Sequence, residues 1–172
     1  ILQVEKNLYL QADTLNNLAF LYHQMGEYEL AAETYENGVE CARSGHNQHA
    51  ETLILTGLGD LYSEIEEFDA ARQAYEQAEA IITGLSNSFI FNYLILARAN
   101  LALLQSDSDR ASEILKSFRK YLKLNPSMFE RGLWALLEGR NHFLKQETKK
   151  AISLLQDAKA CFTRDGRESE SQ

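Results

Sequence analysis

The stretch LAFLYHQMGEYELAAETYENG, residues 18–38, returns forty residues later as LGDLYSEIEEFDAARQAYEQA, residues 58–78. The same offset aligns alanines four times along the chain, at Ala31, Ala71, Ala111 and Ala151. A fixed period of this length is typical of repeat architectures, in which each copy stacks on the next and several copies share one core. The sequence therefore predicts four stacked copies of one structural unit.

Each copy is predicted to contain two amphipathic helices. In the first copy, apolar residues recur at helical spacing over 15–22 and again over 28–39, and Gly26 separates the two runs. Small residues such as Ala19 and Gly59 would let paired helices approach closely, while Tyr35 and Tyr75 would fill the gaps between pairs. The fold class expected from this pattern is all-α.

Composition and charge exclude several classes of protein. The chain has 172 residues, 45% of them hydrophobic, and it contains no apolar run long enough to cross a bilayer. Residues 1–86 hold fifteen acidic and three basic residues, which argues against direct binding of nucleic acid by this segment. Cys41 and Cys161 occupy the same place in the first and last copies, too far apart in a stacked array for a disulfide. A reducing compartment, most simply the cytoplasm, is expected.

The repeat register also predicts boundaries. The copies are expected at residues 12–51, 52–91, 92–131 and 132–163, with residues 164–172 as a polar tail or linker. Continued backwards, the register makes residues 1–11 the tail of a preceding second helix. Because neither end carries a convincing polar cap, we expect the chain to be part of a longer array.

The pattern Leu18-Ala19-x-x-Tyr22 followed by Gly26-x-Tyr28-x-x-Ala31-x-x-x-Tyr35-x-x-Gly38 resembles the tetratricopeptide repeat. The second copy matches as well, and the match weakens in the third and fourth. The forty-residue length is similar to the longer repeats of kinesin light chains and of bacterial regulators of the maltose-regulon activator type. This resemblance implies a right-handed α-solenoid whose first helices line a concave groove.

In such a groove the resemblance implies a protein or peptide partner and no cofactor or metal. The residues that we expect to contact the partner are the following: Asn16, Asn17, Phe20, Thr56, Asp60, Tyr93, Leu96, Asn100, Leu103, Leu133, Leu136, Arg140 and Phe143. Leucine and aromatic anchors would supply affinity, and Asn100 and Arg140 would orient the partner. Alternatively, Leu133, Leu136 and Phe143 would pack against further repeats outside this chain. Capture of a peptide carboxylate, a role of chaperone-binding relatives, is disfavoured because Asp60 would repel it.

Two polar clusters have competing interpretations. Lys116, Arg119, Lys120 and Lys123 are expected on one helix face, where a solvated surface is the simpler interpretation and a phosphate-contacting surface the other. His46 and His49 have the spacing of metal ligands but lack an evident third ligand beyond Glu51, so the sequence predicts no metal site.

The chain contains no glycine-rich phosphate loop and no zinc-type cysteine or histidine spacing, so we expect no catalysis. The preferred hypothesis is a non-catalytic scaffold that binds a protein segment, either from another protein or from another domain of the same polypeptide. One alternative is a sensor segment of a larger transcriptional regulator with ATPase and DNA-binding domains elsewhere. Another is a homo-oligomer, in which the acidic first half of one copy meets the basic second half of the next.

Overall fold

The structure is a computed structural model that describes residues 2–82, 89–124 and 126–170, and side chains within residues 7–166 of that range. Within it the chain forms the following elements: α1 Leu2–Gln24, α2 Tyr28–Ser44, α3 Gln48–Glu64, α4 Phe68–Ile82, α5 Phe89–Leu104, α6 Ser108–Phe118, the 3-10 helix η1 Tyr121–Lys123, α7 Met128–Leu144 and α8 Thr148–Glu170. No described residue lies in a strand, and the predicted all-α class is confirmed.

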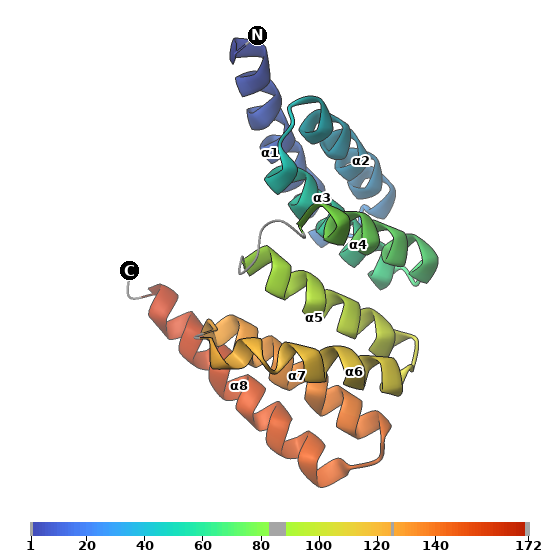
Figure 1. Ribbon diagram of the computed structural model, residues 1–172, viewed down its shortest axis with the longest axis vertical. Helices are drawn as coiled ribbons and strands as arrows, with labels where there is room; N and C mark the ends of the chain where they lie inside the picture. The colour runs from blue at the N-terminus through green and yellow to red at the C-terminus, as the bar shows by residue number, and fades with distance from the viewer. Residues whose placement is uncertain (1, 83–88, 125, 171–172) are drawn as a thin grey trace. The chain divides into compact units, whose positions relative to one another are not determined.

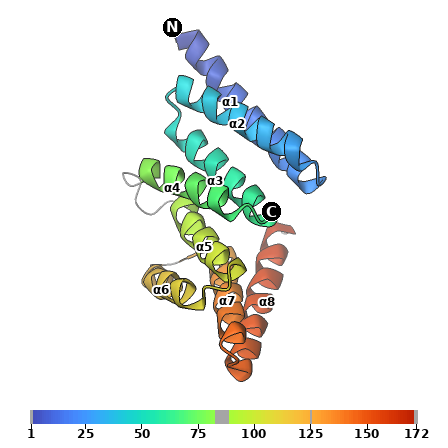
Figure 2. The same cartoon turned by 90° about the vertical axis from the view of Figure 1, so that its right-hand side faces the viewer.

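The helices form two compact units, residues 1–94 and 95–172. In the first unit α1 packs against α2, α3 packs against α4, and α2 joins the two pairs through α3 (Figure 1). In the second unit α7 packs against both α6 and α8, and Figure 2 shows α7 and α8 side by side along their length. Successive helices are thus paired in both units, as the sequence pattern predicts.

The turn between the helices of each pair recurs at forty-residue spacing. One residue in every such turn has a positive φ, namely Gly26 at 78°, Glu66 at 64°, Ser106 at 59° and Gln146 at 61°. The residue after it donates its backbone N–H to a carbonyl five residues earlier, as in Glu27 to Tyr22 and Glu67 to Tyr62. The turn geometry is therefore the same in all four copies, although only the first has glycine, the residue that adopts a positive φ without strain.

Small residues on the first helix of a pair face large side chains on the second. A Cβ atom placed on Gly59 would lie 2.4 Å from the ring of Tyr75, and one on Gly139 would lie 3.0 Å from Leu155. Tyr75 itself is only 1% exposed. The paired helices can therefore approach this closely only because glycine has no side chain at these positions, as the small-residue column in the sequence predicts.

Each unit has its own apolar core. In the first, the buried side chains include several alanines together with Tyr35, Tyr75 and Ile54. In the second, one cluster draws on three helices and consists of Leu96, Ala99, Ala102, Leu103, Ala111, Leu115, Phe118 and Leu137. No helix in the described part of the chain is both long and apolar enough to span a membrane.

The helix ends correct several expectations. α1 is unbroken from Leu2 to Gln24, so residues 2–11 extend the first helix and do not form the tail of a separate one; Ile1 lies outside the described residues. α8 continues to Glu170, through most of the predicted polar tail, and residues 171 and 172 are not described. α6 ends at Phe118, so the basic residues from Lys116 to Lys123 do not share one helix.

Candidate functional site

Residues forty positions apart on successive first helices are neighbours in the second unit. A guanidinium nitrogen of Arg140, on α7, donates a 2.6 Å hydrogen bond to the side-chain oxygen of Asn100, on α5. Both side chains are half-buried. The two residues that the sequence predicts to orient a partner therefore hold each other in place across the two helices.

The predicted residues of α7 form a stripe along one face of that helix. Leu133, Leu136, Arg140 and Phe143 follow the i, i+3, i+7, i+10 spacing that keeps side chains on one side of an α-helix. The two leucines are half-buried, and Phe143 is 66% exposed. We call these four residues the α7 face. It presents the exposed ring of Phe143 one turn from the guanidinium of Arg140, which is hydrogen-bonded to the amide of Asn100.

Three of the predicted contact residues are not available to a partner. Leu96 is completely buried and Leu103 is 4% exposed, because both belong to the core cluster of the second unit. Thr56 is 3% exposed, and its hydroxyl donates to the carbonyl of Thr52 one turn earlier in α3. The sequence pattern identified their helices but assigned their side chains to the wrong side, and we remove them from the candidate surface.

In the first unit the predicted residues of α1 lie on its outer side. Asn16 is half-buried, Asn17 is exposed, and Phe20 is 53% exposed. His23, one turn further along, is buried and hydrogen-bonded through Nε2 to Oε2 of Glu64 at 2.8 Å. Glu64 also accepts a 2.9 Å bond from the hydroxyl of Tyr28, and these two bonds lower its pKa.

Asp60 is a predicted groove residue whose carboxylate is hydrogen-bonded to two tyrosines of the first unit. Its carboxylate accepts hydrogen bonds from the hydroxyls of Tyr75 at 2.6 Å and Tyr93 at 2.7 Å. Burial raises the pKa of Asp60, and these two bonds partly oppose that effect. Burial, with a contribution from the Asp60 charge, also raises the pKa of Tyr35 to about 12. Asp60 and Tyr93 therefore connect α3 to the beginning of α5, and their polar groups are already engaged.

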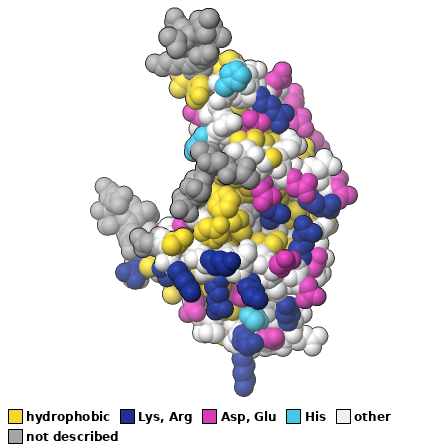
Figure 3. All heavy atoms as spheres, viewed as in Figure 1, with side chains coloured by type: hydrophobic (Ala, Val, Ile, Leu, Met, Phe, Trp, Pro, Cys, Tyr) yellow, Lys and Arg dark blue, Asp and Glu magenta, His cyan; other side chains and the backbone are white. Residues whose placement is uncertain are grey.

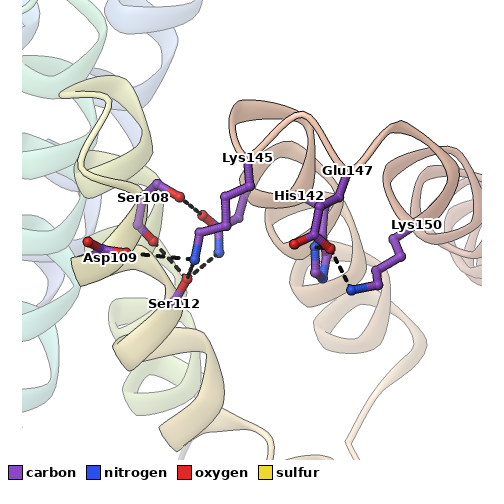
Figure 4. A network of polar contacts seen from close by, with 8 residues as sticks. Ser108, Asp109, Ser112, His142, Lys145, Glu147 and Lys150 are labelled. Carbon is purple, nitrogen blue, oxygen red and sulfur yellow. Dashed lines mark hydrogen bonds and ion pairs between the residues drawn. The ribbon is translucent and has the colours of Figure 1, made fainter.

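A polar network joins the first turn of α6 to the last turn of α7, as Figure 4 shows. Ser108 donates to the side-chain oxygen of buried Asn141 at 2.8 Å, and the amide nitrogen of Asn141 donates to Ser112 at 2.8 Å. The hydroxyl of Ser112 also receives a 2.6 Å bond from Lys145 and donates to the carbonyl of Ser108. A serine next to a lysine is a known nucleophilic pair, but this hydroxyl is fully engaged in joining two helices.

We did not predict this network from the sequence, although the separation of its residues along the chain indicates that they could be neighbours. Ser108 and Asn141 are 33 positions apart, the same separation that joins Asp60 to Tyr93. On α7, His142 bonds through Nδ1 to the Glu147 carboxylate at 3.1 Å.

The histidines with metal-like spacing do not form a ligand set with Glu51. His46 and His49 are exposed, and the Glu51 carboxylate accepts a 2.6 Å bond from Arg43. In the described residues no three side chains of histidine, cysteine, aspartate or glutamate are grouped to hold a metal ion.

Comparison with known proteins agrees with this repeat geometry. A family model described as tetratricopeptide repeat matches residues 10–83. Among solved structures, BtubC (BKLC) of P. vanneervenii is similar, with a TM-score of 0.76 and 17% identity over 92% of this chain and 66% of BtubC. A kinesin light chain-type protein of P. anserina with nearly identical TPR-like repeats has a TM-score of 0.64 and 19% identity, over 95% of this chain and 86% of that one.

At these identities the two structures show the fold alone, and this chain spans just under two thirds of BtubC. A search of curated proteins found no match. The matched residues include the first copy and most of the second, where the sequence pattern is strongest, and the similar structures cover nearly the whole chain. Residues 10–83 are therefore similar to the tetratricopeptide repeat family, and the fold of the chain is an all-α repeat solenoid.

Proposed function

We propose that this chain is a docking scaffold that binds an extended segment of a protein partner on the α7 face. Tetratricopeptide repeats generally mediate interactions between proteins, which supports a binding role. The observation that carries the specific site is the exposed ring of Phe143, 66% accessible, three residues from the half-buried cation of Arg140. An aromatic ring and an arginine on a rigid helix are the side chains that most often dominate binding energy at protein interfaces.

The chemistry of the face defines the partner segment. Arg140 bonds to the amide of Asn100, which carries no charge, so this bond leaves the positive charge of the guanidinium uncompensated. Because the same bond restricts the side chain, less conformational entropy is lost when a carboxylate binds to it. The half-buried Leu136 and exposed Phe143 would pack against an apolar side chain. The expected partner therefore places an aspartate or glutamate within a few residues of a large apolar residue.

A binding role without a reaction is supported by the state of the polar groups nearby. The hydroxyl of Ser112, which lies next to Lys145, accepts hydrogen bonds from Asn141 and Lys145 and donates one to the carbonyl of Ser108 within α6. The two free cysteines are half-buried, which supports a reducing compartment such as the cytoplasm.

The proposal can be tested with a displayed library of random peptides selected on the purified chain. Enriched peptides should combine an acidic residue with a nearby leucine, isoleucine or aromatic residue. Their binding should weaken by about tenfold or more in Phe143→Ala and in Arg140→Gln, since anchor residues contribute about 1–2 kcal/mol or more. Ile152→Ala, which removes another exposed apolar side chain from α8, is the matched control. Peptides that bind both variants as tightly as the unaltered chain would refute the site.

A further inference from the structure

A second surface, away from the α7 face, has the form of a binding site. A cleft of about 320 Å³ lies in the first unit between α2, α3 and α4. Its floor is apolar and is formed by Val39, Leu55, Leu58 and Ala74, whose side chains are all nearly buried. Its rim is polar and comes from α2 and α4, with Glu36, Arg43, Gln73 and Gln77.

Hydrogen bonds between helices fix the shape of the cleft. Arg43 donates to the side-chain oxygens of Gln77 at 2.9 Å and Glu51 at 2.6 Å, which connects α2 to α4 and α3. Two helical turns away along α2, the hydroxyl of Tyr62 donates to Glu36 at 3.3 Å. The cleft is therefore preformed, and binding there would cost little rearrangement.

The surroundings of the cleft are strongly acidic. Residues 27–40, which include most of α2, contain five glutamates and no basic residue. Glu33, Glu36 and Glu40 are exposed, and Figure 3 shows acidic side chains along the edge formed by α2 and α4. The single cation of the rim, Arg43, is paired with Glu51. A ligand that fits the cleft must therefore bring an apolar group for the floor and positive charge for the rim.

The second unit of the same chain presents such a group. Leu124, the residue that ends η1, is 66% exposed. It follows the exposed Lys120 and Lys123, and the stretch 114–129 contains four basic and no acidic residues. In the described part of the chain these four basic side chains form no ion pair, and Arg119 instead lies over the ring of Trp134, 5.9 Å from its centroid.

Figure 3 shows basic side chains gathered over the α6 region. We call Lys120, Lys123 and Leu124 the basic knob.

We propose that the basic knob of one copy of this chain binds in the α2–α4 cleft of a second copy. Leu124 would contact the apolar floor, and Lys120 and Lys123 would pair with the glutamates of α2. The choice of a second copy rests on charge complementarity, because both surfaces belong to the same sequence and have opposite sign. A nucleic acid or an anionic membrane would bind the knob alone and would leave the acidic cleft without a ligand.

The expected behaviour is salt-dependent self-association of the full 172-residue chain. In sedimentation experiments at about 20 mM salt, the average mass should rise above that of the monomer as concentration increases. At about 0.5 M salt it should return to the monomer value, because charges separated by more than a few ångströms are then screened. Leu124→Ser should reduce the low-salt association by tenfold or more.

Charge-reversal variants give a sharper test. Lys120→Glu with Lys123→Glu removes the knob but leaves the cleft intact, and Glu33→Lys with Glu36→Lys does the reverse. Each variant alone should remain monomeric, whereas an equimolar mixture should form a 1:1 complex from the remaining intact knob and cleft. Controls with the same numbers of charge changes at exposed positions on α1 and α8 are Lys149→Glu with Lys159→Glu and Asp13→Lys with Asp157→Lys, and both should associate as the unaltered chain does. Circular dichroism would verify that every variant is folded.

Three results would overturn the proposal. One is a chain that stays monomeric at low salt and high concentration. The second is association that Leu124→Ser leaves unchanged, and the third is a mixture of the two charge-reversed variants that stays monomeric. If the monomeric chain instead bound poly-glutamate or vesicles with anionic lipid through Lys120 and Lys123, the knob would belong to a different partner.

Discussion

Arg140 and Asn100 are separated by forty residues in the sequence and joined by a hydrogen bond of 2.6 Å in the structure. They occupy the same place on two successive first helices, α7 and α5. The forty-residue offset therefore predicts which side chains become neighbours as well as which are alike. The same reasoning explains the recurring turns at Gly26, Glu66, Ser106 and Gln146. Each of the following predictions depends on this repeat geometry or on the polar contacts that it positions.

Gly59→Ala is expected to destabilise the fold although alanine is the better helix former. The added methyl group would lie 2.4 Å from the Tyr75 ring, which has no free space to move into because it is 1% exposed. Overpacking of this kind costs about 1–3 kcal/mol, more than the roughly 1 kcal/mol that helix propensity returns. Urea unfolding would measure the difference. Gly166→Ala is the control, because nothing lies within 4 Å of its added methyl group, and it should be neutral or stabilising.

Glu66→Gly is expected to stabilise the chain by up to about 1 kcal/mol, because Glu66 has a φ of 64°, a conformation that glycine adopts without strain. Gly26→Ala, at the equivalent place in the first copy with a φ of 78°, should destabilise by about the same amount. Thermal or urea unfolding would compare the two. Effects of the same sign for both substitutions would show that the turn geometry does not determine stability here.

Asp60→Asn should change how stability depends on pH. The pKa of Asp60 is raised, chiefly by burial, so the folded protein binds this proton more tightly than the unfolded chain does. The favourable contribution of Asp60 is therefore fully present below the ordinary carboxyl range and is lost as the pH rises through the raised pKa. Relative to the unaltered chain, Asp60→Asn should become more stable as the pH rises above the ordinary carboxyl pKa of about 4.

Urea unfolding at several pH values would measure this change. Asp13→Asn, at an exposed position on α1, is the control and should follow the unaltered chain. A constant difference between Asp60→Asn and the unaltered chain at every pH would contradict the assigned role of Asp60.

Ser127→Ala should destabilise the second unit by about 1 kcal/mol. Ser127 caps α7 through a reciprocal pair of bonds: its hydroxyl accepts from the backbone N–H of Glu130 at 3.1 Å, and the Glu130 carboxylate accepts from the backbone N–H of Ser127 at 2.7 Å. Hydrogen exchange of the first-turn amides of α7 would detect the loss. Exchange that does not change would mean that another group caps this helix.

Much of the fold could be predicted from the sequence because its period is long and regular. The alanine and tyrosine columns identify the paired helices and the small-to-large contacts such as Gly59 with Tyr75. Helix ends were harder to predict. Nothing in the sequence breaks α1 between Leu2 and Gln24, and the repeat register wrongly divided this helix in two.

Only part of the candidate site could be predicted from the sequence. Asn100 and Arg140 were identified together because both are polar residues in a mostly apolar stretch. Leu96 and Leu103 were misplaced because a helix that is apolar on most sides gives no signal of which side faces the core. The contacts of Asp60 with Tyr75 and Tyr93 depend on distances between helices, which a repeat pattern does not contain.

The most direct test of the docking role is the affinity of one selected peptide for the unaltered chain and for Phe143→Ala, measured by titration calorimetry at physiological salt. The account predicts that removing this exposed ring weakens binding by about tenfold or more while the melting temperature stays the same. An unchanged affinity in the folded variant would contradict it.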